Sequence, residues 1–146
     1  LPIFGADIVA NKKIVTAAIT DISPVDDLCH PIYEDIEDIS KYYSFRHNRE
    51  IPAWGNIFSP YCKFARLDDS EEIDTFCHVV NEYLDVFVGA VWKSTMNYNR
   101  ADERYEGQLN YCEKQKKNDK TRKILEKYFG EKWADDYINE VLFDEP

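Results

Sequence analysis

The first part of the chain carries apolar runs typical of β-strands, and most of the remainder carries apolar residues at helical spacing. Residues 2–10 form an apolar run that predicts a strand, with Gly5 allowing a bend or bulge. Residues 14–22 form a second β-rich run, and the short polar turn between the two predicts an antiparallel hairpin. A third strand is predicted over residues 57–67.

Helical spacing begins after this hairpin. Apolar residues three or four positions apart predict an amphipathic helix over residues 32–43. A longer apolar stripe from Ile73 to Val91 predicts a second helix, which Ser70 can cap. Three more helices are predicted, over residues 105–117, 120–129 and 132–143. Gly130 would end the middle one, and the order of the elements indicates an α+β fold with helices packed on an antiparallel sheet.

The composition fits one packed domain over residues 1–146. Hydrophobic residues make up 44% of the chain, which argues against disorder, but no apolar run is long enough to span a membrane. The net charge of -10 argues against nucleic acid as a partner. The cysteines Cys29, Cys62, Cys77 and Cys112 show no CxxC spacing, and the histidines form no close pair with one another. Reduced thiols are therefore expected, rather than a zinc site or a disulfide framework.

Three features could carry chemistry. Asp7 interrupts an apolar strand and faces either solvent or an apolar space, where desolvation would raise its pKa and make it a proton donor. Residues 114–123 hold six of the 18 basic residues, which suits either docking of an acidic protein or a solvated helix face. Asn118 or Asp119 within this segment could cap a helix. Arg49 lies in a loop rich in aromatic residues, where it could bind a carboxylate or simply face water.

Four segments carry a resemblance to a known family. They are LPIFGADIVA at 1–10, AAITDISP at 17–24, REIPAWGNIFSPYC at 49–62 and YCEKQKKNDKTRKILEKYFGEKWADDYINEVLFD at 111–144. Together they resemble the ferredoxin-dependent bilin reductases, with weaker likeness over 25–48 and 68–105. The resemblance implies a three-layer α/β/α sandwich with a central antiparallel sheet.

The activity that the resemblance implies is reduction of the linear tetrapyrrole biliverdin IXα by electrons from reduced ferredoxin. The resemblance also implies that no flavin or metal is bound and that the protein supplies binding, orientation and protons. The phycocyanobilin-forming branch is the most similar. A phycoerythrobilin-forming relative and a non-catalytic bilin-binding module remain as alternatives.

The resemblance also implies roles for individual residues. Asp7 and Asp119 match acidic positions beside the bilin and are the expected catalytic residues. Residues expected to bind the substrate are Thr16, Arg49, Asn118, Lys120, Ile124 and Leu142, and Trp54 is either a pocket wall or core. Residues expected to dock ferredoxin are Lys114, Lys116, Lys117, Arg122 and Lys123, because ferredoxins are acidic.

The family pattern begins upstream of this sequence. Family members carry further strands with a histidine that pairs with the aspartate and, in the phycocyanobilin-forming branch, a glutamate, and neither is present here. The chain therefore resembles the C-terminal part of one such domain with the N-terminal strands missing. We expect an unpaired sheet edge, and low solubility or no activity when the chain is alone. A monomeric protein of the cytoplasm, or of the plastid stroma in a eukaryote, is expected.

Overall fold

The computed structural model describes residues 1–12, 14–28, 30–95 and 98–145. Its strands are β1 (Ile3–Ala10), β2 (Val15–Ser23), β3 (His47–Asn48) and β4 (Lys63–Leu67). Its helices are α1 (Ile32–Tyr42), α2 (Ser70–Lys93), α3 (Ala101–Gln115), α4 (Asp119–Phe129) and α5 (Glu131–Tyr137), followed by the π-helix η1 (Ile138–Leu142). The α+β class is confirmed.

The strands form one antiparallel sheet in the order β1-β2-β4-β3. β1 and β2 pair along their whole length, from Ile3 opposite Ser23 to Ala10 opposite Val15, which confirms the predicted hairpin. A bulge between Val9 and Ala10 shifts the register at the end of β1. Within the described residues β1 is an edge strand, because only β2 pairs with it.

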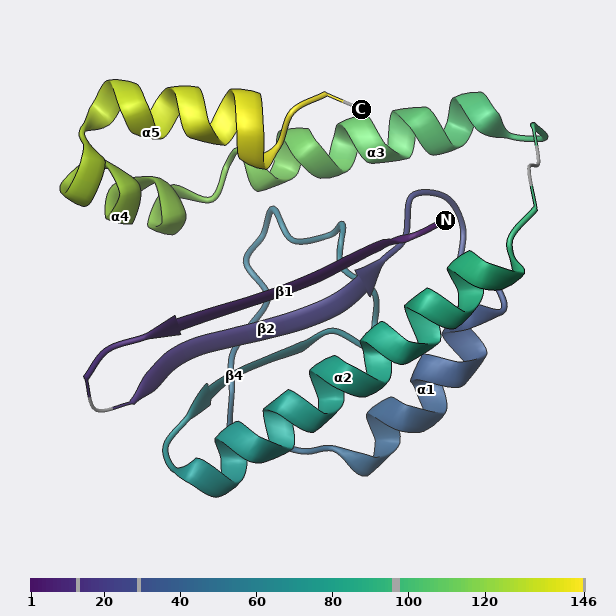
Figure 1. The fold of residues 1–146 in the computed structure, drawn as a ribbon, viewed down its shortest axis with the longest axis horizontal. Helices are drawn as coiled ribbons and strands as arrows, with labels where there is room; N and C mark the ends of the chain where they lie inside the picture. Colours follow the sequence, from purple (N-terminus) through teal and green to yellow (C-terminus); the bar gives the residue numbers. More distant parts are fainter. Residues whose placement is uncertain (13, 29, 96–97, 146) are drawn as a thin grey trace.

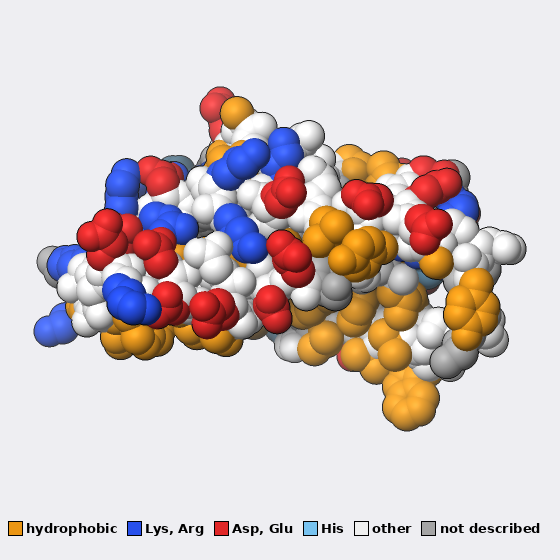
Figure 2. Space-filling view, turned by 90° about the horizontal axis from the view of Figure 1, so that it is seen from above, with side chains coloured by type: hydrophobic (Ala, Val, Ile, Leu, Met, Phe, Trp, Pro, Cys, Tyr) orange, Lys and Arg blue, Asp and Glu red, His pale blue; other side chains and the backbone are white. Residues whose placement is uncertain are grey.

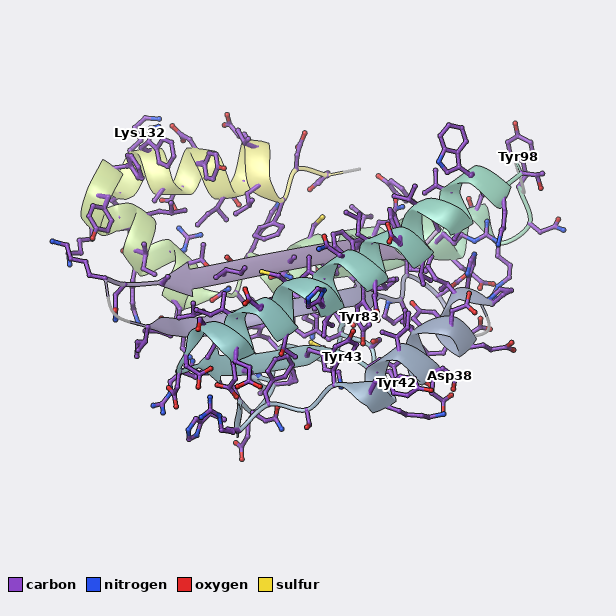
Figure 3. All side chains as sticks on the ribbon, turned by 60° about the horizontal axis from the view of Figure 1, so that its bottom comes forward. Asp38, Tyr42, Tyr43, Tyr83, Tyr98 and Lys132 are labelled. Atoms are coloured by element: carbon purple, nitrogen blue, oxygen red, sulfur yellow. The ribbon has the colours of Figure 1, made fainter. Side chains whose placement is uncertain are left out.

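Helices α1 and α2 cover one face of the sheet (Figure 1). Ala18 and Ile22 of β2 are fully buried there against Phe76 and Tyr83 of α2. The Tyr83 hydroxyl, labelled in Figure 3, donates a hydrogen bond of 2.7 Å to the backbone oxygen of Tyr61. The main core lies on this face, between the sheet and helices α1 and α2. Burying each large apolar side chain there stabilises the fold by about 1.5–3 kcal/mol.

Helices α3, α4 and α5 form a separate layer on the other side of β1 from α2 (Figure 1). A Cβ added to Gly5 of β1 would lie 3.6 Å from the hydroxyl oxygen of Tyr111 in α3, so Tyr111 contacts the sheet at this point. α3 also crosses the β2–α1 loop closely, because a Cβ on Gly107 would overlap the backbone oxygen of Val25. Arg104 pairs with Asp26 in the same loop at 3.3 Å. One end of α3 is thereby fixed to the loop that leaves the sheet.

Several predicted boundaries are wrong, each for a local reason. The third strand covers only Lys63–Leu67, because the preceding residues form turns. Asp69, not Ser70, caps α2, since the Asp69 side chain accepts a hydrogen bond from the Glu72 N–H. The helix predicted over 105–117 begins at Ala101.

The C-terminal helices follow the predicted spacing more closely. Gly130 ends α4 with φ 88°, a left-handed conformation that glycine adopts without strain, as predicted. The helix predicted over 132–143 divides into α5 and the π-helix η1. Across the described residues, no helix is both long and apolar enough to cross a membrane.

Candidate active site

The sheet face turned toward α3–α5 is set by the alternation of side chains along β1. Phe4 points to α2, where its ring centroid lies 5.9 Å from that of Phe87. Gly5 faces Tyr111 on the opposite side. Because successive strand residues point to opposite faces, Asp7 shares the face of Gly5. The structure thus decides the face that the sequence pattern left open.

A row of three side chains crosses this face. Asp7 of β1 is directly opposite Ile19 of β2, and Ile19 is directly opposite Phe64 of β4. Ile19 and Phe64 are half-buried and give the face an apolar floor. Strands in a sheet are spaced about 4.8 Å apart, so Asp7 and Phe64 are separated by roughly 10 Å.

Arg49 completes the row beyond Phe64. Its backbone N–H donates a hydrogen bond of 2.8 Å to the Phe64 oxygen, and its guanidinium carbon lies 5.7 Å from the centre of the Phe64 ring. This cation–π contact holds a positive charge at one end of the apolar floor, with the Asp7 carboxyl at the other. Such a surface can accept a flat apolar molecule that also carries carboxylates.

Asp7 itself is exposed, so of the two environments considered for its carboxyl the described residues provide solvent and not an enclosed apolar space. The reason is its position on an edge strand. Residues Ala6 to Ile8 are exposed, whereas Gly5, two residues before Asp7, faces Tyr111. The role of Asp7 as a proton donor is a separate matter and stays a prediction.

Thr16 lies beside the bulge that ends β1. Its hydroxyl donates a hydrogen bond of 3.0 Å to the backbone oxygen of Val9. The hydroxyl therefore stabilises the hairpin, and its expected contact with substrate remains a prediction. Trp54 is half-buried with its ring 5.9 Å from that of Phe58, within the loop before β4.

The start of α4 is built by its own side chains. The Asn118 side-chain oxygen accepts a hydrogen bond of 3.5 Å from the Thr121 N–H, so Asn118 is the helix cap, one of the two roles considered for it. Asp119 is exposed and accepts a hydrogen bond of 2.6 Å from Lys123, which lowers the pKa of the Asp119 carboxyl. Lys120 is exposed on the same turn.

The remaining residues expected to line the bilin lie on α4 and η1. Ile124 is 44% exposed and Leu142 is 40% exposed, which is high for aliphatic side chains. Both side chains are therefore available to contact another molecule. Their assignment to a bilin pocket stays a prediction.

The expected docking residues differ in their availability. Arg122 forms an ion pair with Asp135 of α5, and Lys123 pairs with Asp119. Lys114 and Lys116 are half-buried, while Lys117 is exposed. Part of this cationic segment therefore stabilises the helices of its own layer. This agrees with the second of the two interpretations of residues 114–123, a helix face in contact with solvent.

Asp21 is a buried carboxylate that the sequence analysis missed. It is opposite Gly5 on the same sheet face as Asp7, and it is 2% exposed. Ser23 and Ser59 donate to it: the Ser23 hydroxyl at 2.7 Å, the Ser59 N–H at 2.9 Å and the Ser59 hydroxyl at 2.5 Å. Burial raises its pKa, and these hydrogen bonds oppose the shift. The available signal was an acid among isoleucines in the second β run.

The thiols and the potential metal ligands offer no further reactive centre among the described residues. Cys62, Cys77 and Cys112 are free, and burial raises the pKa of the Cys62 thiol, which makes it a poor nucleophile. Cys29, the fourth predicted thiol, lies outside the described residues. Among the residues placed by the structure, no group of three or more His, Cys, Asp and Glu is arranged to hold a metal ion.

A solved structure has the same fold. It is that of phytochromobilin synthase from tomato in complex with biliverdin, with a TM-score of 0.82 and 21% sequence identity. The match covers 98% of this chain and 55% of the tomato chain. At this identity the likeness shows the fold alone.

Sequence comparison identifies the family. Residues 1–144 match the family model described as ferredoxin-dependent bilin reductase. Phycocyanobilin:ferredoxin oxidoreductase from Synechococcus sp. (strain CC9902) is 46% identical over 156 residues, which cover 100% of this chain and 61% of the relative. The protein of the same name from Prochlorococcus marinus (strain MIT 9303) is 44% identical over 151 residues, which cover 100% of this chain and 56% of the relative.

The chain therefore belongs to the ferredoxin-dependent bilin reductase family. It spans 56–61% of the length of these curated relatives.

Proposed function

We propose that this chain is the C-terminal part of a single bilin reductase domain, and that the whole protein reduces biliverdin IXα to phycocyanobilin with electrons from reduced ferredoxin. The family match over residues 1–144 and the names of the cyanobacterial relatives support this proposal. The structural observation that carries it is the row from Asp7 to Arg49 across the sheet face beneath α3–α5.

The row has the chemistry that a bilin needs. The half-buried Ile19 and Phe64 provide an apolar surface for the flat tetrapyrrole, and the Arg49 guanidinium offsets the charge of a propionate. Each electron from ferredoxin makes the pigment more basic, so a proton must follow from the protein or solvent. Asp7 is proposed to donate that proton, and it is then reprotonated from water at its exposed position.

The helical layer supplies further groups in this proposal. Asp119 is proposed as a second catalytic residue, which must leave Lys123 before its carboxyl can carry a proton, and Lys120 as a partner of a propionate, both at the start of α4. Asn118 holds this turn in place as its cap. Ile124 and Leu142 are proposed to close the pocket over the bilin, which would account for their exposure in the described chain.

The test follows reduction by absorbance without oxygen. The protein that carries this chain is mixed with biliverdin and reduced ferredoxin, in the unaltered form and as Asp7→Asn. We expect transient radical bands and a blue product from the unaltered protein, and we expect Asp7→Asn to bind biliverdin equally well but to stop or misdirect its reduction. Asp85→Asn, an exposed acid on α2 at the other face of the sheet, is the matched control. Full reduction by Asp7→Asn would remove Asp7 from the mechanism.

The same assay separates the alternatives. A violet product would indicate a phycoerythrobilin-forming enzyme, whose pocket directs the proton to another part of the pigment. A biliverdin spectrum that stays unchanged after ferredoxin is added would indicate a non-catalytic bilin-binding module. The exposure of Asp7 favours this second candidate for the 146-residue chain alone. A monomer in the cytoplasm or plastid stroma completes the proposal.

A further inference from the structure

One face of α3 is held against the sheet by a row of contacts. Arg104 and Gly107 contact the loop that follows β2. One helical turn beyond Gly107, the hydroxyl of Tyr111 lies over Gly5 of β1. Residues three or four positions apart share one face of a helix, so all three contacts lie on the same side of α3. The position of Tyr111 is therefore fixed by the packing of the whole helix.

Tyr111 bounds the part of the sheet face that carries Asp7. α3 runs along β1 in the same direction, from the end where Ile3 pairs with Ser23 (Figure 1). Asp7 is two residues beyond Gly5, about 7 Å further along the strand. The strand is exposed there, whereas at Gly5 the Tyr111 side chain reaches the strand. The exposed face thus ends at Tyr111 on the Gly5 side.

The hydroxyl at this boundary is a hydrogen-bond donor. Its oxygen accepts a hydrogen bond of 3.0 Å from the side-chain nitrogen of Gln115, one turn further along α3. Among the described residues, the hydroxyl donates its own proton to none. Burial raises the pKa of Tyr111, so the hydroxyl stays protonated near neutral pH. The group is neutral, oriented by an amide, and able to donate to another molecule.

The face that Tyr111 bounds is the apolar one. Figure 2 looks onto the outer surface of the layer formed by α3–α5 and shows acidic and basic side chains interspersed toward its α4–α5 end. The half-buried Ile19 and Phe64 form the apolar floor on the inner side of this layer. A flat pigment held against that floor has the helical layer above it and Tyr111 at one end.

A bilin offers one kind of acceptor that suits this donor. Its two propionates are charged and pair best with cations, for which Arg49 and Lys120 are proposed. Its ring nitrogens lie along the inner side of the pigment, and most of them are donors themselves. The remaining acceptors are the lactam oxygens, one on each end ring. A neutral hydroxyl at the end of the face matches a neutral carbonyl oxygen at the end of the pigment.

We propose that the Tyr111 hydroxyl donates a hydrogen bond to the lactam oxygen of one end ring of the bilin. The proposal rests on the proposed function and adds a substrate-binding residue to it. Asp7 lies two residues further along β1, so an end ring held at Gly5 determines which part of the pigment faces that carboxyl. Tyr111 would thereby contribute to the choice of the ring that receives the proton.

The test measures binding and the spectrum of bound biliverdin, without ferredoxin. The protein that carries this chain is titrated with biliverdin, and the lactam carbonyl bands of the bound pigment are recorded by infrared difference spectroscopy. Tyr111→Phe keeps the ring against Gly5 and removes the hydroxyl. It should raise Kd about three- to tenfold, as expected for one hydrogen bond, and shift one lactam band to higher frequency. Tyr105→Phe, also on α3 and 46% exposed, is the matched control and should change neither.

A third variant separates the hydroxyl from the amide that orients it. Gln115→Ala leaves the Tyr111 hydroxyl in place, so it should raise Kd less than Tyr111→Phe does. A larger loss from Gln115→Ala would place the amide, and not the hydroxyl, against the pigment and would overturn the proposal. Circular dichroism verifies that each variant is folded.

The carbonyl bands distinguish substrate contact from packing. If Tyr111→Phe raises Kd and leaves both lactam bands unshifted, Tyr111 only packs α3 on the sheet and the proposal is wrong. An unaltered Kd together with unaltered bands refutes it as well, and in either case binding by the unaltered protein leaves the proposed function standing. Failure of the unaltered protein to bind biliverdin would overturn the proposed function and this inference with it.

Discussion

Gly107 should be indispensable to the packing of α3, whereas another helical glycine should not. A Cβ on Gly107 would overlap the backbone oxygen of Val25 and would lie 2.5 Å from its carbonyl carbon and 2.8 Å from its Cα. Ordinary contacts begin near 3.4 Å. Backbone atoms cannot rotate away as a side chain can, so Gly107→Ala must move α3 off the β2–α1 loop.

The magnitude follows from two opposing terms. Replacing glycine by alanine within a helix stabilises it by about 1 kcal/mol. Overpacking against fixed atoms costs about 1–3 kcal/mol or more. Because three backbone atoms of Val25 block the new Cβ, the cost should lie in the upper part of this range, about 2–3 kcal/mol, and Gly107→Ala should lower the free energy of unfolding by about 1–2 kcal/mol. Gly89→Ala in α2, where no atom lies within 4 Å of the new Cβ, should raise it by about 1 kcal/mol.

Urea unfolding followed by circular dichroism measures both variants. The free energy of unfolding should be lower than that of the unaltered chain for Gly107→Ala and higher for Gly89→Ala, with a difference of about 2–3 kcal/mol between the two variants. A displaced α3 would also separate Arg104 from Asp26, so Arg104→Gln should cost less in the Gly107→Ala background than alone. If Gly107→Ala were as stable as Gly89→Ala, α3 would not cross the loop as described, and the helical layer would lack its fixed end.

Two further predictions concern buried and capping groups. Because burial raises the pKa of Asp21, the native state binds its proton more tightly than the unfolded state, and stability should fall as pH rises from the ordinary value of 3.8 through the raised pKa. Asp21→Asn keeps an acceptor for the Ser59 N–H and should abolish this slope in urea unfolding; a slope that persists would assign it to another group. Asn118→Ala removes the cap of α4 and should lower the free energy of unfolding by about 1 kcal/mol, while Asp119→Ala should change it less. The reverse order in thermal unfolding would make Asp119 the structural residue and weaken its proposed role with the bilin.

The sequence pattern predicted elements better than it predicted their ends. The hairpin of β1 and β2, the stripe of α2 and the stop at Gly130 all depend on residues within a few positions of one another. The third strand was predicted too long because its first half has a strand-like composition. In the structure the Ser59 N–H donates to Asp21, 38 residues earlier, instead of entering the sheet. No local pattern contains that contact.

The site residues also divide into those whose contacts the local sequence predicts and those whose contacts come from distant segments. The cap at Asn118 could be predicted from the residue type alone. The ion pair of Arg122 with Asp135 could not, because it joins two helices whose packing depends on the turn at Gly130. Asp21 escaped notice since its burial comes from a distant loop, and Asp7 drew attention although it is exposed.

By itself, the order of residues determined where strands and helices form, which acids interrupt them, and that the positive charge gathers in one segment of an acidic chain. Only the tertiary structure decided which face each strand residue takes. Both the odd-numbered and the even-numbered positions of β1 carry apolar residues, so its sequence does not show which set faces α2 and which faces α3. Phe87 and Tyr111, contributed by helices far along the chain, make that choice by packing against Phe4 and Gly5. The orientation of Asp7 is thus a property of contacts between distant segments, while its presence in a strand is a property of its neighbours.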